Sequence, residues 1–337
     1  SDVCSSDLGA PITFAAAPGA VVWMDGSDRF RANAFIQQGQ VGLVLRTIPQ
    51  RIPNFDELGL PPVLKDVALE KRGLVLVVGA TGSGKSTSLA AMIDHINNTQ
   101  NAHILTIEDP IEFLIRDRKS IISQRELGLD TKSFSSALRA ALRQDPDVIL
   151  VGEMRDEETI RMALTAAETG HLVFSTLHTN DATETINRIL ANMEGDAQLA
   201  VRMQLASVLV GVVSQRLISR AEKKGRVAAV EILINNARVR DLILDPARTA
   251  DIRRVLDESN DLGMQSFDKS LLELCAAKQI SEKEALAQCC NPRDFQLRLK
   301  GIVAGDWSNV GPSKSSFNEF SVDKIEIQGF ESVKKKA

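Results

Sequence analysis

The stretch that decides the fold is LVLVVGATGSGKST, residues 74–87. Its five leading apolar residues run into a glycine-rich turn that ends in a lysine and two hydroxyl side chains. The spacing of Gly79, Gly84, Lys85 and Ser86 satisfies G-x-x-x-x-G-K-[ST], a pattern that requires a buried strand before it and a helix after it. Apolar residues at helical spacing follow the turn, so both requirements are met. The sequence therefore predicts a phosphate-binding loop that holds a nucleotide.

Each residue type in this loop suits a phosphate group. Glycines let backbone N–H groups turn inward around the anion, and the following helix presents the positive end of its dipole. We expect Lys85 to neutralise charge between the β- and γ-phosphates and Ser86 to ligate Mg²⁺. A glycine-rich turn with an exposed lysine is the alternative interpretation. The predicted nucleotide-binding residues are Gly79, Ala80, Thr81, Gly82, Ser83, Gly84, Lys85, Ser86 and Thr87.

A phosphate loop needs an acidic side chain near the metal ion, and its usual place is the carboxyl end of a neighbouring buried strand. Residues 148–151, VILV, predict such a strand, and Glu153 follows it closely. Glu153 is therefore the predicted ligand of Mg²⁺ or of its water. Asp147 stands at the amino-terminal end of the strand, so we assign it a structural role. A surface glutamate that opens a helix is the alternative for Glu153.

Further candidates follow two other predicted strands. The strand HILTI is followed by Glu108 and Asp109, where a carboxylate could orient or deprotonate an attacking water. In isolation, this acidic run would be interpreted as a solvated turn. His178 comes at the carboxyl end of the strand in HLVFSTL and could reach a γ-phosphate. His171 precedes that strand, so a structural hydrogen bond is its expected role.

Composition limits the class of protein. The chain has 337 residues and a net charge of −4, with two tryptophans and no tyrosine, which disfavours a nucleic-acid partner. Its apolar runs are far shorter than the ~20 residues that cross a bilayer. Four cysteines without a C-x-x-C pair indicate free thiols in a reducing compartment, so we expect a cytoplasmic protein.

The pattern of apolar and polar residues along the chain predicts an α/β fold in several parts. Residues 1–8 are polar and serine-rich, and we interpret them as a disordered end or an assembly scar. Residues 9–60 contain alternating strand patterns and predict a small, partial sheet domain. In residues 61–300, strands alternate with amphipathic helices, which indicates a parallel sheet covered on both faces and a helical carboxyl-terminal part. Residues 301–337 predict a flexible tail.

Four ordered motifs carry a resemblance to a known family. They are GATGSGKST, TIEDPIEF, DPDVILVGEMRDEETIRMALTAAETGHLVFSTLHT and GRVAAVEIL. Together they resemble the secretion-type hexameric ATPases, and within these the type IV pilus retraction ATPases of twitching motility, the PilT/PilU type. The resemblance covers about residues 28–300. The family's AIRAGG-like segment has only a loose counterpart around residues 238–242, where an ordinary amphipathic helix is the alternative.

The resemblance implies a RecA-like P-loop NTPase domain, preceded by a small, truncated PAS-like α+β domain. It implies a hexamer that hydrolyses ATP with Mg²⁺ and pulls on an inner-membrane pilus platform protein, in some cases beside a second retraction ATPase. Glu108 resembles the family's water-activating glutamate and Glu153 its Walker B acid, and His171 and His178 match its His box. Arg31 and Arg46 fall where the family supplies arginines to a neighbouring subunit's ATP site. Exposed strand arginines are the alternative for these two.

Several alternatives stay open. The chain could be a nucleotide-binding accessory or regulatory subunit of a retraction motor, since its motifs mix features of PilT and PilU. It could also be a secretion or pilus assembly ATPase, although it lacks the four-cysteine zinc insert that such proteins often carry. The family's sheet domain begins earlier than it does here, so a fragment is one of the open interpretations of the chain.

Overall fold

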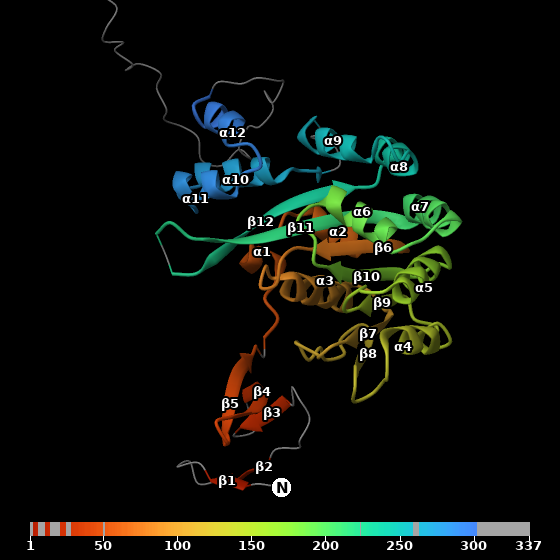
Figure 1. Cartoon of the computed structure of the whole chain (residues 1–337), viewed down its shortest axis with the longest axis vertical. Helices are drawn as coiled ribbons and strands as arrows, with labels where there is room; N and C mark the ends of the chain where they lie inside the picture. The colour runs from red at the N-terminus through yellow and green to blue at the C-terminus, as the bar shows by residue number, and fades with distance from the viewer. Residues whose placement is uncertain are drawn as a thin grey trace, which may run out of the picture. The chain divides into compact units, whose positions relative to one another are not determined.

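The computed structural model describes residues 3–5, 11–13, 21–24, 28–49, 51–222, 224–258 and 263–301. Its contacts divide the chain into two units, Ser1–Cys290 and Asn291–Ala337 (Figure 1). Within the described part of the second unit, helix α12 (Pro292–Leu299) begins at Asn291, whose side chain accepts a hydrogen bond from the Asp294 amide. The flexible tail predicted for residues 301–337 lies outside the described residues except for Gly301, and it stays a prediction.

The first unit is built on a seven-stranded sheet with the strand order β12-β11-β6-β10-β9-β7-β8. Six of its strands run parallel, as predicted, but β12 pairs antiparallel with β11, so the sheet is mixed. A hairpin explains the reversal, because β11 ends at Ser219 and β12 begins at Arg226, and antiparallel neighbours need no crossover helix. The strands are β6 (Gly73–Val78), β7 (His103–Glu108), β8 (Ile121–Glu126), β9 (Val148–Val151), β10 (Leu172–Leu177), β11 (Leu209–Ser219) and β12 (Arg226–Ile234).

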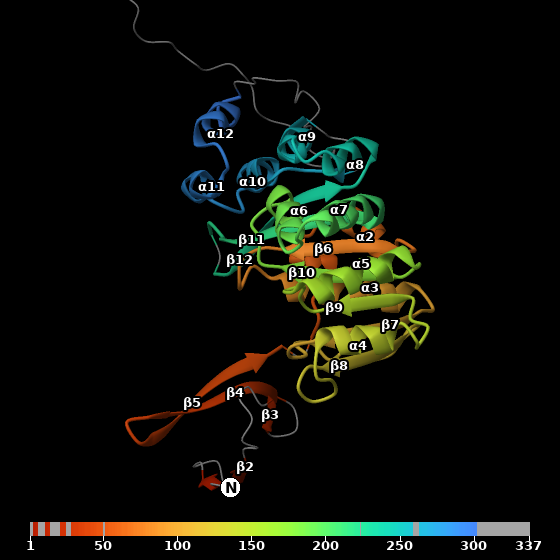
Figure 2. The same ribbon diagram turned by 45° about the vertical axis from the view of Figure 1, so that its right-hand side comes forward.

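Helices cover both faces of this sheet and create two hydrophobic cores (Figure 2). Strand β6 contributes Leu74 and Leu76 to one core and Val75 and Val77 to the other, which is why it is apolar at every position. The first core also takes in residues of α4 (Phe134–Ala141), α5 (Glu157–Glu168), α6 (Ala182–Ala191), α7 (Asp196–Val208), α8 (Ala237–Leu244) and α9 (Ile252–Glu258). The second takes in residues of α1 (Phe55–Leu58), α2 (Val63–Ala68) and α3 (Lys85–Thr99).

The carboxyl-terminal part of this unit is helical, as predicted. Helix α10 (Phe267–Ala276) packs against β12 and is followed by α11 (Glu282–Gln288). The loosely matched AIRAGG-like segment forms α8. Within the described ranges, every helix is too short or too polar to cross a lipid bilayer.

The amino-terminal residues form small antiparallel sheets. Strands β3 (Val21–Met24), β4 (Asp28–Gln37) and β5 (Gln40–Ile48) make a three-stranded sheet, in agreement with the alternating pattern. Val3–Ser5 forms β1 and pairs with β2 (Pro11–Thr13), and the interpretation of residues 1–8 as a disordered end or an assembly scar stays a prediction. Strand pairing supplies backbone hydrogen bonds that a polar sequence pattern does not reveal. The PAS-like character of this region stays a prediction.

Candidate active site

The phosphate loop connects β6 to α3 through residues 79–84. Gly79, Gly82 and Gly84 have φ angles of 145°, 79° and 93°, a region that glycine enters without steric cost. Gly84 occupies the cap position of α3, so the first free N–H groups of that helix face the loop. The predicted strand–loop–helix arrangement is confirmed.

Lys85 is held inside this loop rather than turned to solvent. It is 8% exposed, and its ammonium donates hydrogen bonds to the carbonyls of Gly79 (2.7 Å) and Ala80 (3.1 Å). Burial lowers the pKa of Lys85, while the negative charges of Glu153 and Glu112 act in the opposite direction. The alternative of an exposed lysine is therefore wrong. A buried cation beside two carboxylates is suited to contact the charged oxygens of a phosphate.

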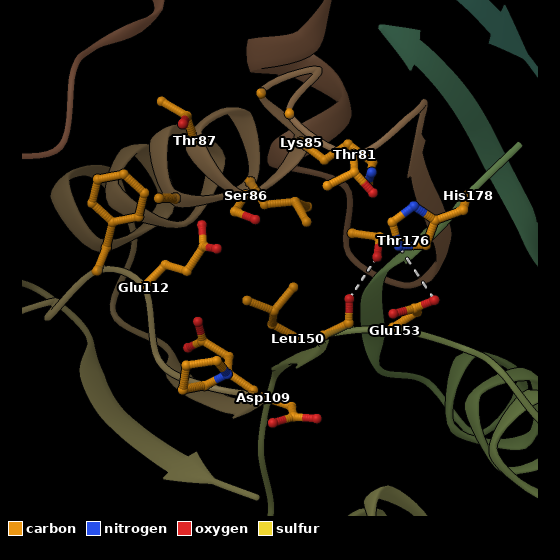
Figure 3. Close-up of a pocket in the computed structure, with 18 of the residues that line it drawn as sticks. Thr81, Lys85, Ser86, Thr87, Asp109, Glu112, Leu150, Glu153, Thr176 and His178 are labelled. Carbon is orange, nitrogen blue, oxygen red and sulfur yellow. Dashed lines mark hydrogen bonds and ion pairs between the residues drawn. The ribbon is translucent and has the colours of Figure 1, made fainter. Parts of the chain in front are cut away.

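Glu153 lies at the carboxyl end of β9 and meets His178 from the end of β10. Its Oε1 is 3.5 Å from His178 Nε2, and its Oε2 is 2.8 Å from Arg155 Nη2. Nearby, the Thr176 hydroxyl donates to the carbonyl of Gly152 (2.6 Å), which ties the ends of the two strands together (Figure 3). The backbone after β9 is thus fixed where it presents Glu153.

Glu108 ends β7 and is held by two donors. Thr106 Oγ1 donates to its Oε1 at 2.7 Å, and Gln124 Nε2 donates to the same oxygen at 3.1 Å. Burial raises the pKa of Glu108, and these hydrogen bonds lower it in part. A carboxylate with a raised pKa is a stronger base, which is the property that proton abstraction from water requires.

These groups converge on one cavity of about 430 Å³. In Figure 3, Glu112 enters the cavity from one side, and Glu153 and His178 enter from the other. The predicted site residues that line this cavity are Thr81, Gly82, Gly84, Lys85, Ser86, Thr87, Glu108, Glu153 and His178. Gly79, Ala80 and Ser83 line an adjoining pocket of about 380 Å³ together with Thr81 and Gly82.

The oxygen donors around Ser86 fit a hard divalent cation. The serine hydroxyl, Glu153 and the acidic residues after β7 all line the same cavity, and Mg²⁺ prefers oxygen ligands and retains several waters. Such an ion would neutralise phosphate charge there.

Other predicted residues lie elsewhere. His171 Nδ1 is 2.9 Å from the carbonyl of Ala166, which confirms its structural role, and Asp147 accepts a hydrogen bond from the amide of His103 (2.8 Å). Arg31 and Arg46 are cross-strand partners in β4 and β5. Their side chains lie outside the described residues, so their contribution to a neighbouring site stays a prediction.

Sequence reasoning missed several residues that line the cavity, among them Leu217, Arg226 and Arg155. Leu217 and Arg226 reach the cavity from the hairpin of β11 and β12, more than a hundred residues beyond the loop. Arg155 lines it as well and pairs with Glu153. Arg155 follows the same strand end as Glu153, so it could have been predicted from the sequence. Leu217 and Arg226 could not, because the hairpin of β11 and β12 brings them to the site.

The fold and this cavity define a P-loop ATPase. The chain belongs to the family described as Type II/IV secretion system protein, which matches residues 29–259. It is 50% identical over 270 residues to the type IV pilus retraction ATPase PilT of Pseudomonas aeruginosa, covering 80% of this chain and 78% of that protein.

Two further relatives agree. The type IV pilus ATPase PilU of the same organism is 45% identical over 275 residues, which are 82% of this chain and 72% of that protein. The crystal structure of the pilus retraction motor PilT with bound ADP superposes with a TM-score of 0.76 at 46% identity, covering 82% of this chain and 78% of that one.

Proposed function

We propose that this chain is an ATP-hydrolysing motor that powers type IV pilus retraction in twitching motility. The names and identities of its relatives support this assignment. The observation that carries it is the convergence of Lys85, Glu108 and Glu153 on one cavity beside the phosphate loop. A cation, a base with a raised pKa and a metal-binding acid are the three groups that hydrolysis of a triphosphate requires.

Each group has a part in the reaction. Lys85 and the loop amides bind the β- and γ-phosphates, and Ser86 with Glu153 would hold Mg²⁺. Glu108 accepts a proton from the attacking water. His178 contacts Glu153 and holds its carboxylate in place. The bound metal ion supplies charge neutralisation at the phosphate oxygens.

The motor works as a homo-oligomer, a hexamer by the resemblance described above. Arg31 and Arg46 of one subunit reach the ATP site of its neighbour, where they balance charge on the transferred phosphoryl group. The ring is cytoplasmic and peripheral at the inner membrane, where it contacts the pilus platform protein. A second retraction ATPase is a further partner, and nucleic acid is not.

ATP turnover of the purified chain, measured with its mass in solution, tests this function. We expect turnover to coincide with a hexamer and to be abolished in Lys85→Ala and in Glu153→Ala. Unchanged turnover in both variants would reject the site. Nucleotide binding without turnover, together with co-purification of a second ATPase, would instead support an accessory subunit.

Mixed rings test the arginines. Subunits carrying Arg31→Ala and Arg46→Ala keep an intact phosphate loop, and subunits carrying Lys85→Ala keep intact arginines. If the arginines act on a neighbour, mixing the two inactive variants restores part of the turnover. Mixing that restores nothing, although both variants assemble, would show that the arginines do not act in this way.

A further inference from the structure

Strand β11 extends past the end of β6 and reaches the phosphate loop. The register between these strands ends with Ser214 opposite Val78, so Gln215 is the first residue beyond the ladder and lies beside Gly79. Gln215 is 3% exposed and sits 130 residues beyond Lys85 in the chain. The loop is therefore bordered by a residue from a distant part of the sequence.

Gln215 contacts the loop at both ends. The ideal position of a Cβ atom on Gly79 overlaps the Gln215 carbonyl oxygen, and a Cβ on Gly84 would lie 2.8 Å from Gln215 Nε2. Gly79 is therefore required by a backbone neighbour as well as by its φ angle, whereas a side chain at Gly84 would displace the amide of Gln215. Gln215 Oε1 also accepts a buried hydrogen bond from the hydroxyl of Ser88 at 2.7 Å. The side chain of Gln215 thus lies between Gly84 and Ser88 in the first turn of α3, whereas the contact with Gly79 is made by the backbone of Gln215.

The next residue along the strand, Arg216, fixes this position from the opposite face. Its guanidinium lies 4.1 Å above the ring of Phe267 in α10, and Nη1 donates to the carbonyl of Gln288 at 2.7 Å. Because successive strand residues point to opposite faces, Arg216 anchors the strand end to the carboxyl-terminal helices while Gln215 faces the loop.

We propose that Gln215 is a positioning residue that holds the phosphate loop and the start of α3 in the geometry that binds nucleotide. Its side chain acts through Ser88 and Gly84, and its backbone carbonyl limits the space at Gly79. Its loss should therefore weaken phosphate binding more than it slows the chemical step. This inference rests on the proposed ATPase function and adds to it a residue outside the loop.

The test compares Gln215→Met with the unsubstituted chain. Methionine conserves length but removes the acceptor for Ser88. We expect KM for ATP, and Kd for Mg²⁺–ADP measured by calorimetry, to rise about 10-fold while kcat changes less than about threefold. Ser88→Ala removes the other partner, so the double variant should bind ADP about as weakly as the more affected single variant.

Two matched controls separate positioning from general stability. Gln265 is another buried glutamine, whose Nε2 donates to the carbonyl of Val230 (2.7 Å), and Ser270 Oγ accepts from the Val230 amide (3.1 Å). Gln265→Met and Ser270→Ala should lower Tm without raising Kd for ADP. If Gln215→Met also lowers only Tm, or if its effect adds fully to that of Ser88→Ala, the inference is wrong.

The experiment also distinguishes failure of this inference from failure of the proposed function. If Gln215→Met does not fold, the ADP Kd of Ser88→Ala decides the question by the same criterion. If the unsubstituted chain binds ADP but does not hydrolyse ATP, the proposed function fails, while the ADP comparison still decides whether Gln215 positions the loop.

Discussion

His178 and Glu153 meet across the ends of two neighbouring parallel strands, with Nε2 3.5 Å from Oε1. The contact closes the side of the cavity that faces away from Glu112 (Figure 3). It joins the first residue after β10 to the residue predicted to hold the metal ion.

Replacing His178 by alanine should slow turnover without abolishing nucleotide binding. The variant loses the partner of Glu153, so we expect kcat to fall about 10- to 100-fold while Kd for ADP stays within about threefold. His171→Ala is the matched control, because that ring bonds the carbonyl of Ala166 outside the cavity. Equal kinetic losses in the two variants would show that the contact has no specific role.

Glu108→Gln should separate folding from chemistry. An amide oxygen can still accept from Thr106 and Gln124, so Tm should not fall, yet the base is lost and kcat should drop at least about 100-fold. Because burial raises the pKa of Glu108, turnover of the unsubstituted chain should increase as pH rises through that pKa. A pH–rate profile measures this increase of turnover with pH. If the same increase persists in Glu108→Gln, another group causes it.

Gly79→Ala should be far more damaging than Gly82→Ala. Both positions have positive φ, but a Cβ on Gly79 would meet the Gln215 carbonyl and the Ser83 side chain, whereas a Cβ on Gly82 meets nothing within 4 Å. Strain alone costs about 1 kcal/mol in Gly82→Ala, so this variant should bind ADP. Gly79→Ala should lose binding, as calorimetry can show. Equal ADP affinities would contradict the close contact.

Glu231 should give stability a pH dependence. This carboxyl is buried, accepts hydrogen bonds from the amide of Ala182 (2.9 Å) and the hydroxyl of Ser214 (3.0 Å), and burial raises its pKa from 4.5 to about 7. The negative charge of Asp181 raises this pKa further, and the positive charge of Arg216 lowers it. Between these two pH values the folded chain binds more protons than the unfolded chain, so stability falls as pH rises through this window.

The variant Glu231→Gln keeps an acceptor and removes the titration. Relative to it, the unsubstituted chain should lose at most about 3 kcal/mol of unfolding free energy between pH 4.5 and pH 7. Urea denaturation at pH 5 and pH 8 measures the difference, and other titrating groups cancel because both proteins contain them. If the free energy of unfolding changes equally with pH in both proteins, Glu231 is not the cause of the change.

The sequence predicted the central strands well because they are buried on both faces. β6 and β9 are apolar at every position except Gly73, so their ends could be located, and strand direction then placed Glu153 at the site and Asp147 away from it. The run DATE, residues 181–184, also carries a local N-cap pattern at the start of α6. Asp181 accepts from the amide of Glu184 (2.8 Å), but the Glu184 side chain accepts from the amide of Asn180 (2.8 Å) rather than from Asp181 itself.

The parts that the sequence did not reveal depend on long-range pairing. β8 carries polar residues at the edge of the sheet, so it lacks the apolar pattern of the other strands. The hairpin of β11 and β12 follows α7 without a turn signal, and its antiparallel pairing brings Leu217 and Arg226 to the cavity. The helix or strand preference of a short segment does not reveal such contacts, because the partner residues lie far along the chain.

A structure of the chain with Mg²⁺ and a non-hydrolysable ATP analogue tests the central claim most directly. We expect the β- and γ-phosphates in the loop of residues 79–87, within hydrogen-bonding distance of Lys85 Nζ. The metal ion should lie between Ser86 and Glu153, with Glu108 facing the γ-phosphate. A nucleotide bound elsewhere, or a loop that stays empty at saturating analogue, would contradict the account.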